Sequence, residues 1–171
     1  IFSSLGNYEG CRSEPELSQN VYRHDPETGE TIVISDDYLG PNGLAFSPDE
    51  QILYIVESRG EPTRKILAYD VAEDGRAISG KRVLIDAGPG GTPDGFRVDV
   101  DGNLWCGWGM GDPALDGVMI FNPEGQPIGR IALPERCANV CFGGRANSRL
   151  FMAASQSVYA LYVNVAGVRG G

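Results

Sequence analysis

The sequence repeats one arrangement of short strands and turns at intervals of about 50 residues. Asn42 is followed 52 positions later by Asp94, and Asp94 is followed 45 positions later by Asn139, each at the matching place in its repeat. Repeats of about 40–50 residues with four short strands are typical of β-propeller blades. A solenoid is the alternative, but its repeats usually carry helices or have a shorter period. We therefore predict an all-β fold, a β-propeller, of which this chain forms three to four blades.

Two kinds of segment alternate within the repeat. The first is a hairpin that opens with a small polar loop, and the second is an aromatic-rich strand that ends in a turn. The hairpins are PNGLAFSPDEQILYIVES (41–58), PDGFRVDVDGNLWCGWG (93–109) and ANVCFGGRANSRLFMAAS (138–155). The second segments are NVYRHDPETGE (20–30), KILAYDVAEDGR (65–76), GVMIFNPEGQ (117–126) and SVYALYVNVAG (157–167). No stretch sustains a 3.6-residue apolar period, so almost no helix is expected.

The charge and hydropathy of the chain exclude several classes of partner. The formal net charge is −9, and an acidic chain repels phosphate backbones, so we expect no nucleic-acid partner. No apolar stretch approaches the ~20 residues of a membrane span, and no signal peptide is visible. We expect a soluble protein with no membrane partner, and the sequence leaves open whether it is cytoplasmic or periplasmic.

The ends of the chain suggest that the propeller is partial. The first residue is Ile1 rather than Met, within what reads as a strand. A closed propeller has at least four blades and often six or more, so we expect earlier blades upstream of Ile1. Since no linker or shift in composition divides the chain, we treat residues 1–171 as one partial propeller domain.

The cysteines do not form a recognisable metal motif. They are Cys11, Cys106, Cys137 and Cys141, with no CxxC pair, and the single histidine, His24, reads as a surface residue. A structural zinc site is therefore poorly supported. We favour buried free thiols over a disulfide, although the sequence does not decide between them.

The opening loops of the hairpins carry the candidate chemistry. The innermost strand of each propeller blade lines the central channel, so Asn42, Asp94 and Asn139 should gather around one small volume. A carboxylate and amide oxygens suit a hard cation, with Ca²⁺ as the first expectation and Mg²⁺, Mn²⁺ or Zn²⁺ as alternatives. Asn and Asp also favour turns for purely structural reasons. Their register with the repeat favours a site at Asn42 and Asp94, whereas Asn139 lacks the flanking Pro and Gly.

Two tryptophans admit two interpretations. Trp105 and Trp108 could form a wall against a sugar ring. Packing between blades is the commoner role of such aromatic residues, and it is the one we expect.

Several motifs resemble one known family. They are GPNGLAFSPDE (40–50), LYIVES (53–58), GTPDGFRVDVDGNLW (91–105), GRIALPE (129–135) and NVCFGG (139–144). Together they are similar to the gluconolactonase family, which includes senescence marker protein 30, or regucalcin. The resemblance extends over essentially the whole chain.

The resemblance implies a fold, a cofactor and site residues. The family's six-bladed propeller holds a divalent metal in its channel and hydrolyses sugar lactones such as glucono-1,5-lactone. By its motifs, Asn42 matches a metal ligand, and Asp94 matches a metal ligand that is also the proposed general base. The family's third ligand, a Glu, and its substrate-contacting Arg and Asn come from N-terminal blades that this chain does not match. The chain would thus be the last three to four blades, completed by the missing blades or a second chain.

The expected function is therefore metal-dependent hydrolysis of a sugar lactone. The mechanism would use Asp94 to orient a water and accept its proton, next to a cation held by Asn42 and Asp94. The alternative is a non-catalytic propeller fragment or protein-interaction module.

Overall fold

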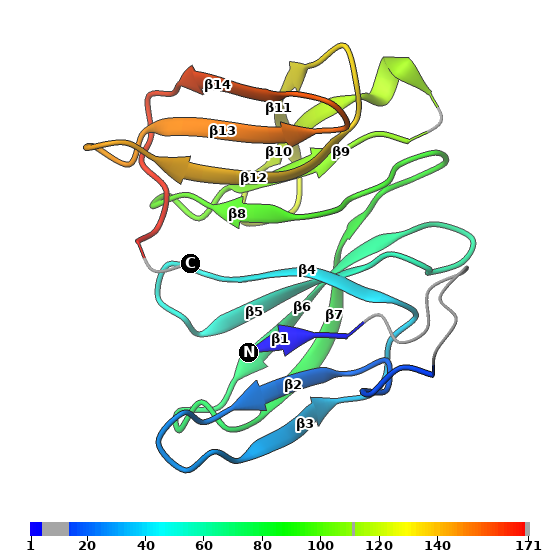
Figure 1. Ribbon diagram of the computed structural model, residues 1–171, viewed down its shortest axis with the longest axis vertical. Helices are drawn as coiled ribbons and strands as arrows, with labels where there is room; N and C mark the ends of the chain where they lie inside the picture. The colour runs from blue at the N-terminus through cyan, green and yellow to red at the C-terminus, as the bar shows by residue number, and fades with distance from the viewer. Residues whose placement is uncertain (5–13, 111, 170–171) are drawn as a thin grey trace.

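The computed structural model describes residues 1–4, 14–110 and 112–169. Their regular structure is almost entirely β, as expected, and forms four antiparallel sheets (Figure 1). Within these ranges the helical exception is a 3₁₀ turn, η1 (Pro113–Leu115), whose start is capped by the Asp112 carboxylate.

The four sheets follow one another along the chain. The first contains β1 (Phe2–Ser3), β2 (Val21–His24) and β3 (Thr31–Ser35), and the second contains β4 (Pro41–Phe46), β5 (Ile52–Glu57), β6 (Lys65–Val71) and β7 (Ile78–Asp86). The third contains β8 (Phe96–Val98), β9 (Leu104–Trp108), β10 (Gly117–Phe121) and β11 (Pro127–Ala132), and the fourth contains β12 (Cys137–Gly143), β13 (Arg149–Ala154) and β14 (Val158–Tyr162).

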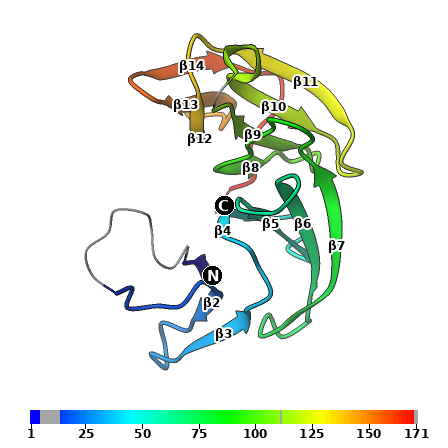
Figure 2. The same ribbon diagram turned by 90° about the vertical axis from the view of Figure 1, so that its right-hand side faces the viewer.

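The sheets are arranged as the blades of a propeller. Figure 2 shows them fanning out in an arc, with β4 and β8 on the concave side and β7 and β11 on the convex side. Each of the last three sheets begins with its innermost strand, β4, β8 or β12, and steps outwards along the chain. The prediction of three to four blades is thus confirmed, with four present. In a closed propeller this concave side would face the central channel, and we call it the channel wall.

Burial on both faces of the blades explains why the strands read as continuous apolar runs. Successive side chains of a strand point to opposite faces of its sheet. Leu53 and Ile55 of β5 therefore pack into a cluster with the first sheet, while Tyr54 and Val56 pack into a cluster with the third sheet. Every one of these side chains is buried, so hydrophobic burial holds the second blade to both of its neighbours.

The tryptophans pack between blades, as predicted. Trp105 meets Phe142 of the fourth sheet edge-on, with ring centroids 5.6 Å apart. Trp108 packs against Phe121 at the same centroid distance, within the cluster between the second and third sheets. Neither ring is available as an exposed wall, because both side chains are buried.

The thiols agree with the interpretation that we favoured. Cys106 and Cys137 are buried and free, whereas Cys141 is free and exposed. Cys11 lies outside the described residues. In the described part of the chain, no helix has the length and apolar character needed to cross a bilayer.

A buried carboxylate organises the β8–β9 hairpin. Asp99 is completely buried, and its side chain accepts a hydrogen bond of 2.8 Å from the Trp105 indole and bonds of 2.9 and 3.1 Å from the Asn103 amide. The backbone amides of Asp101 and Asn103 donate to it as well. A buried charge is tolerated when hydrogen bonds satisfy it in this way.

We expect Asp99→Ala to lower the free energy of unfolding by about 3 kcal/mol, because it leaves the indole and amide donors unsatisfied in the interior. Chemical denaturation would measure the change. Asp101→Ala is the matched control: it lies in the same turn but is exposed, and it should change stability by less than about 0.5 kcal/mol. Equal effects of the two substitutions would contradict this role for Asp99.

Candidate functional site in the propeller channel

The innermost strands are irregular where they enter the channel. We predicted a loop at residues 41–43, but β4 already begins at Pro41, and its pairing with β5 shifts between Pro41 and Leu44. Asn42 and Gly43 therefore lie in a bulge. The pairing of β12 shifts in the same way between Cys137 and Asn139. Bulges redirect side chains near functional sites, and here one redirects Asn42.

Asn42 and Asp94 meet across two blades, as the repeat predicted. The Asn42 side-chain amide Nδ2 donates a hydrogen bond of 3.1 Å to Asp94 Oδ1. The Asp94 side chain is only 18% exposed. Two residues separated by 52 positions therefore share one polar contact at the channel wall.

Two glycines allow the loops to approach so closely. A Cβ atom on Gly43 would lie 2.6 Å from the Asp94 carbonyl oxygen, and one on Gly95 would overlap the Asn139 carboxamide. The Gly95 amide also donates a hydrogen bond of 2.9 Å to Ala138 O, which ties the third blade to the fourth. The glycines that follow Asn42 and Asp94 thus serve the contact between blades as well as the turn.

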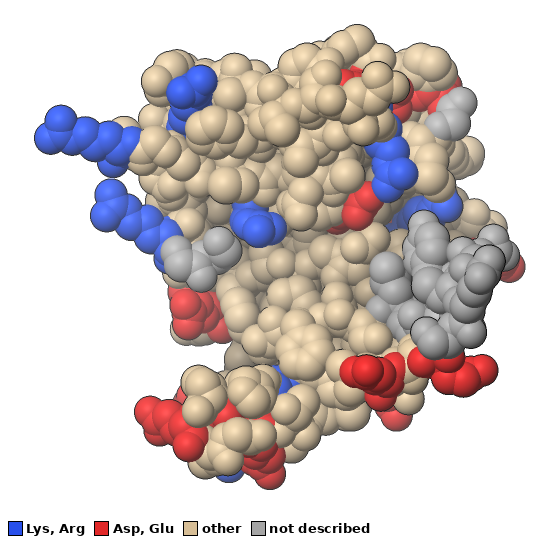
Figure 3. All heavy atoms as spheres, viewed as in Figure 1, with Lys and Arg blue, Asp and Glu red and all other residues tan. Residues whose placement is uncertain are grey.

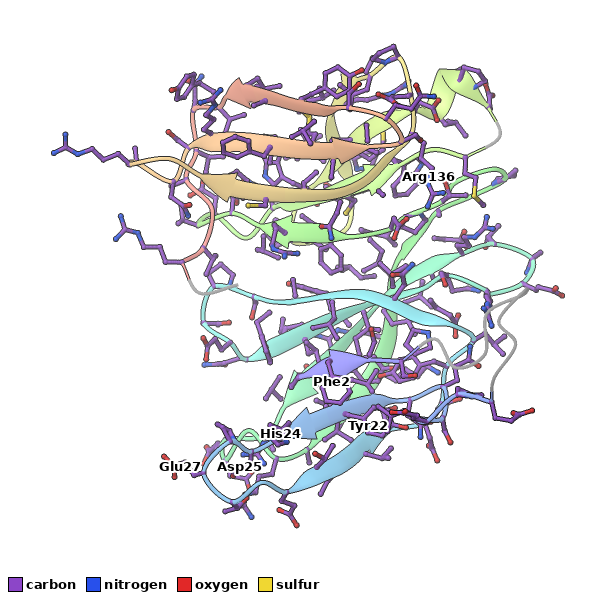
Figure 4. All side chains as sticks on the ribbon, in the orientation of Figure 1. Phe2, Tyr22, His24, Asp25, Glu27 and Arg136 are labelled. Atoms are coloured by element: carbon purple, nitrogen blue, oxygen red, sulfur yellow. The ribbon has the colours of Figure 1, made fainter. Side chains whose placement is uncertain are left out.

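Arg136 is a site residue that the sequence interpretation missed. Its Nη2 donates to Asp94 Oδ2 at 2.5 Å, and its Nη1 lies 3.5 Å from the Met110 sulfur. Figure 4 shows Arg136 at the end of the channel wall where β8 and β12 begin. The sequence did contain a signal for it. Arg136 directly precedes β12, the innermost strand of the fourth blade, and so lies on the same channel face as Asn42 and Asp94.

Asn139 lies beside this pair without joining it. Its side chain packs on Gly95, and its Oδ1 accepts a hydrogen bond of 2.8 Å from the Val140 amide. The hydrogen bonds of the described residues include none from Asn139 to Asn42 or Asp94. His24 is far from the site: it is exposed on β2, next to Thr31, and lies at the lower edge of Figure 4.

The donor atoms at Asn42 and Asp94 are chemically suited to a hard cation. Ligand oxygens around Ca²⁺ lie 2.3–2.6 Å from the ion, so adjacent ligands are about 3 Å apart, similar to the 3.1 Å between these side chains. The Asn42 oxygen can take the place of Nδ2 by rotation of the amide. Within the described ranges, no three His, Cys, Asp or Glu residues cluster as a metal site. These two residues thus fit as part of a ligand set.

The two buried thiols are poor nucleophiles. Burial raises the pKa of the Cys137 thiol to about 11, while the hydrogen bond to the Asn139 backbone partly offsets this rise and the opposite charges of Asp94 and Arg136 act against each other. Burial also raises the pKa of Cys106 far above its ordinary value. Since the thiolate is the reactive form, neither residue suits covalent catalysis at neutral pH.

Comparison with known proteins identifies a family. Residues 4–156 match the SMP-30/Gluconolactonase/LRE-like region. A gluconolactonase of Zymomonas mobilis is 34% identical over 84% of this chain and 40% of its own length. A lactonohydrolase of Aspergillus oryzae is 30% identical over 90% of this chain and 36% of its own length. The solved structure of a gluconolactonase from Xanthomonas campestris is 37% identical, with a TM-score of 0.75 over 89% of this chain and 47% of that one. The chain thus spans less than half the length of these relatives.

We expect Gly43→Ala to displace the Asp94 loop, because the new Cβ would meet backbone atoms that cannot move aside independently. The cost should be about 2 kcal/mol of unfolding free energy, as for other overpacked sites. The amide resonances of Asp94 and Gly95 should also shift in ¹H–¹⁵N NMR spectra. Gly129→Ala is the control, since its Cβ would meet only the Ile120 side chain. Unchanged resonances of Asp94 and Gly95 in the Gly43 variant would refute the proposed contact.

Proposed function

This chain belongs to the SMP-30/gluconolactonase/LRE-like family, and on that premise we propose that it hydrolyses a sugar lactone at the Asp94 site. The observation that carries the proposal is the convergence of Asn42, Asp94 and Arg136 from three blades onto one point of the channel. The relatives named as gluconolactonases support the substrate class.

Lactone hydrolysis requires a base and a means of stabilising negative charge. Water attacks the carbonyl carbon, and the ring C–O bond breaks to give an open-chain hydroxy acid. We propose that Asp94 accepts a proton from the attacking water and later returns it to the departing ring oxygen. Each Asp94 oxygen accepts one side-chain hydrogen bond and keeps a further lone pair for that water.

We propose that Asn42 and Asp94 also hold a divalent cation, with Ca²⁺ first and Mg²⁺, Mn²⁺ or Zn²⁺ as alternatives. Such a cation would polarise the lactone carbonyl and make a bound water more acidic. Asn42 contributes a neutral oxygen, so that only Asp94 offsets the charge on this side of the site.

Arg136 has two consequences for this chemistry. Its guanidinium fixes the orientation of the Asp94 carboxylate through Nη2. Its positive charge also lies where a cation would bind, and like charges at this separation repel. Arg136 therefore positions the base while weakening cation binding.

The alternative of a non-catalytic interaction module is not favoured, because relatives at 30% and 34% identity that cover most of this chain are named as a lactonohydrolase and a gluconolactonase.

We expect Asp94→Asn to lower kcat/KM for glucono-1,5-lactone at least ~100-fold, since it removes the base and the charged ligand together. A pH-indicator assay with added Ca²⁺, corrected for spontaneous hydrolysis, would measure the loss. Asp101→Asn, an exposed change in the same blade, is the control and should keep wild-type kinetics. Full activity of the Asp94 variant would disprove the mechanism.

Substituting the two hydrogen-bond partners of Asp94 should change cation affinity in opposite directions. We expect Asn42→Ala to weaken Ca²⁺ binding about 10-fold through loss of a ligand oxygen. Arg136→Gln should strengthen it by a similar factor through loss of a repelling charge. Isothermal titration calorimetry would measure both, with Arg130→Gln on the outer strand β11 as the neutral control. Affinity changes of the same sign would contradict a shared site.

A further inference from the structure

A second pocket lies further along the same three innermost strands. Its volume is about 110 Å³, and it is separate from the Asp94 site. Its walls come from the end of β4, from β8 and from β12, and the C-terminal segment lies over it. Its lining includes the charged residues Glu50, Arg97 and Arg169 and the aromatic residues Phe46 and Phe142.

The hydrogen bonding of β8 identifies which of its groups face the channel. Alternate residues of an antiparallel strand direct their backbone groups to opposite sides. The carbonyl of Gly95 accepts a hydrogen bond from the amide of Gly107 in β9. By this alternation, the carbonyls of Phe96 and Val98 point away from β9. Val98 O agrees with this, because it accepts a hydrogen bond of 3.1 Å from the amide of Val168. The Phe96 carbonyl has the same orientation and points into the channel.

The Arg97 guanidinium donates a hydrogen bond to that carbonyl, and this contact places its positive charge on the channel wall. Its Nη1 donates a hydrogen bond of 2.8 Å to Phe96 O. A guanidinium has five N–H donors in a planar fork that matches carboxylate, phosphate or sulfonate oxygens. This backbone contact is the one side-chain hydrogen bond of Arg97 among the described residues, and Arg97 also lines the pocket.

The charge of Arg97 is not compensated within the described residues. No carboxylate there lies within 4.0 Å of its guanidinium, in contrast to the Arg136–Asp94 pair. The pocket also contains Arg169 and a single carboxylate, Glu50, so its lining is net positive in a chain of net charge −9. Figure 3 shows most basic side chains of this face over its upper part, with carboxylates both among them at the upper right and around the lower edge.

The spacing along β8 links this pocket to the Asp94 site. Arg97 is three residues after Asp94, so their Cα atoms are at most about 11 Å apart. A six-carbon sugar lactone is shorter than this distance, but the hydrogen bond to Phe96 O turns the Arg97 guanidinium back toward Asp94. A lactone at Asp94 that carries an anionic group on its exocyclic carbon would therefore present that group toward Arg97.

We propose that Arg97 and its pocket bind an anionic group at the end of the substrate remote from the lactone, so that the substrate class is an acidic sugar lactone. The group would be a carboxylate, a phosphate or a sulfonate, held by the free guanidinium donors. This proposal rests on the proposed lactone hydrolysis for the orientation of the ligand, but anion binding at Arg97 can be measured independently of turnover.

The test uses stable hydroxy acids, which are the products of hydrolysis and do not decompose. Binding of gluconate, glucarate and 6-phosphogluconate would be measured by calorimetry for the wild-type protein and for Arg97→Gln, Arg97→Lys and Arg130→Gln. The wild-type protein should bind at least one of the two acids with a second anionic group at least ten times more tightly than gluconate. The comparison of glucarate with 6-phosphogluconate identifies whether carboxylate or phosphate is preferred.

The variants separate a specificity role from a structural one. Arg97→Gln should reduce the preference to less than twofold, Arg97→Lys should retain part of it, and Arg130→Gln should leave it unchanged. Equal wild-type affinity for all three acids, or an unchanged preference in Arg97→Gln, would overturn the proposal whatever the hydrolysis assay shows. Retained anion preference without hydrolysis of any lactone would instead overturn the proposed function and support anion binding by Arg97.

Discussion

The close contact between the innermost strands of neighbouring blades is the constraint on which the rest of the structure depends. Hydrophobic burial drives the blades together, but the strands can meet at the channel only where side chains leave room. Gly43 and Gly95 provide that room, and the hydrogen bond from Gly95 N to Ala138 O fixes the third blade against the fourth. Because these glycines directly follow Asn42 and Asp94, the same close contact that packs the blades together also fixes the positions of these two polar residues.

This arrangement places a carboxylate between two unlike donors. Asn42 gives Asp94 a neutral hydrogen bond, whereas Arg136 gives it a charged one. Charge-assisted hydrogen bonds are the stronger kind and also orient their acceptor. The charge of Asp94 is thus already partly balanced by the protein, and a cation at this site competes with a guanidinium. The proposed chemistry therefore depends on a balance between orienting the base and attracting the metal.

The same strands continue from the Asp94 site to a second polar region. Arg97 donates a hydrogen bond to the Phe96 carbonyl of β8 and lines the pocket beside it. The two tryptophans do not contribute to this pocket, because Trp105 and Trp108 are buried between blades, whereas Phe46 and Phe142 form part of its lining. The pocket therefore combines aromatic side chains with the two arginines.

Much of this was determined by the sequence alone, because the repeat, the turn residues and the apolar runs are local patterns. They specified a β-propeller with up to four blades, and the register of the repeat correctly paired Asn42 with Asp94. Local patterns could not identify Arg136 or Arg97, because an arginine beside a strand looks the same whether it faces solvent or the channel. Only the tertiary structure decided this, since the bulges in β4 and β12 and the packing of neighbouring blades determine where each side chain points. It also separated Asn139 from the Asn42–Asp94 pair, because the Asn139 oxygen accepts a hydrogen bond from the adjacent amide of Val140 instead.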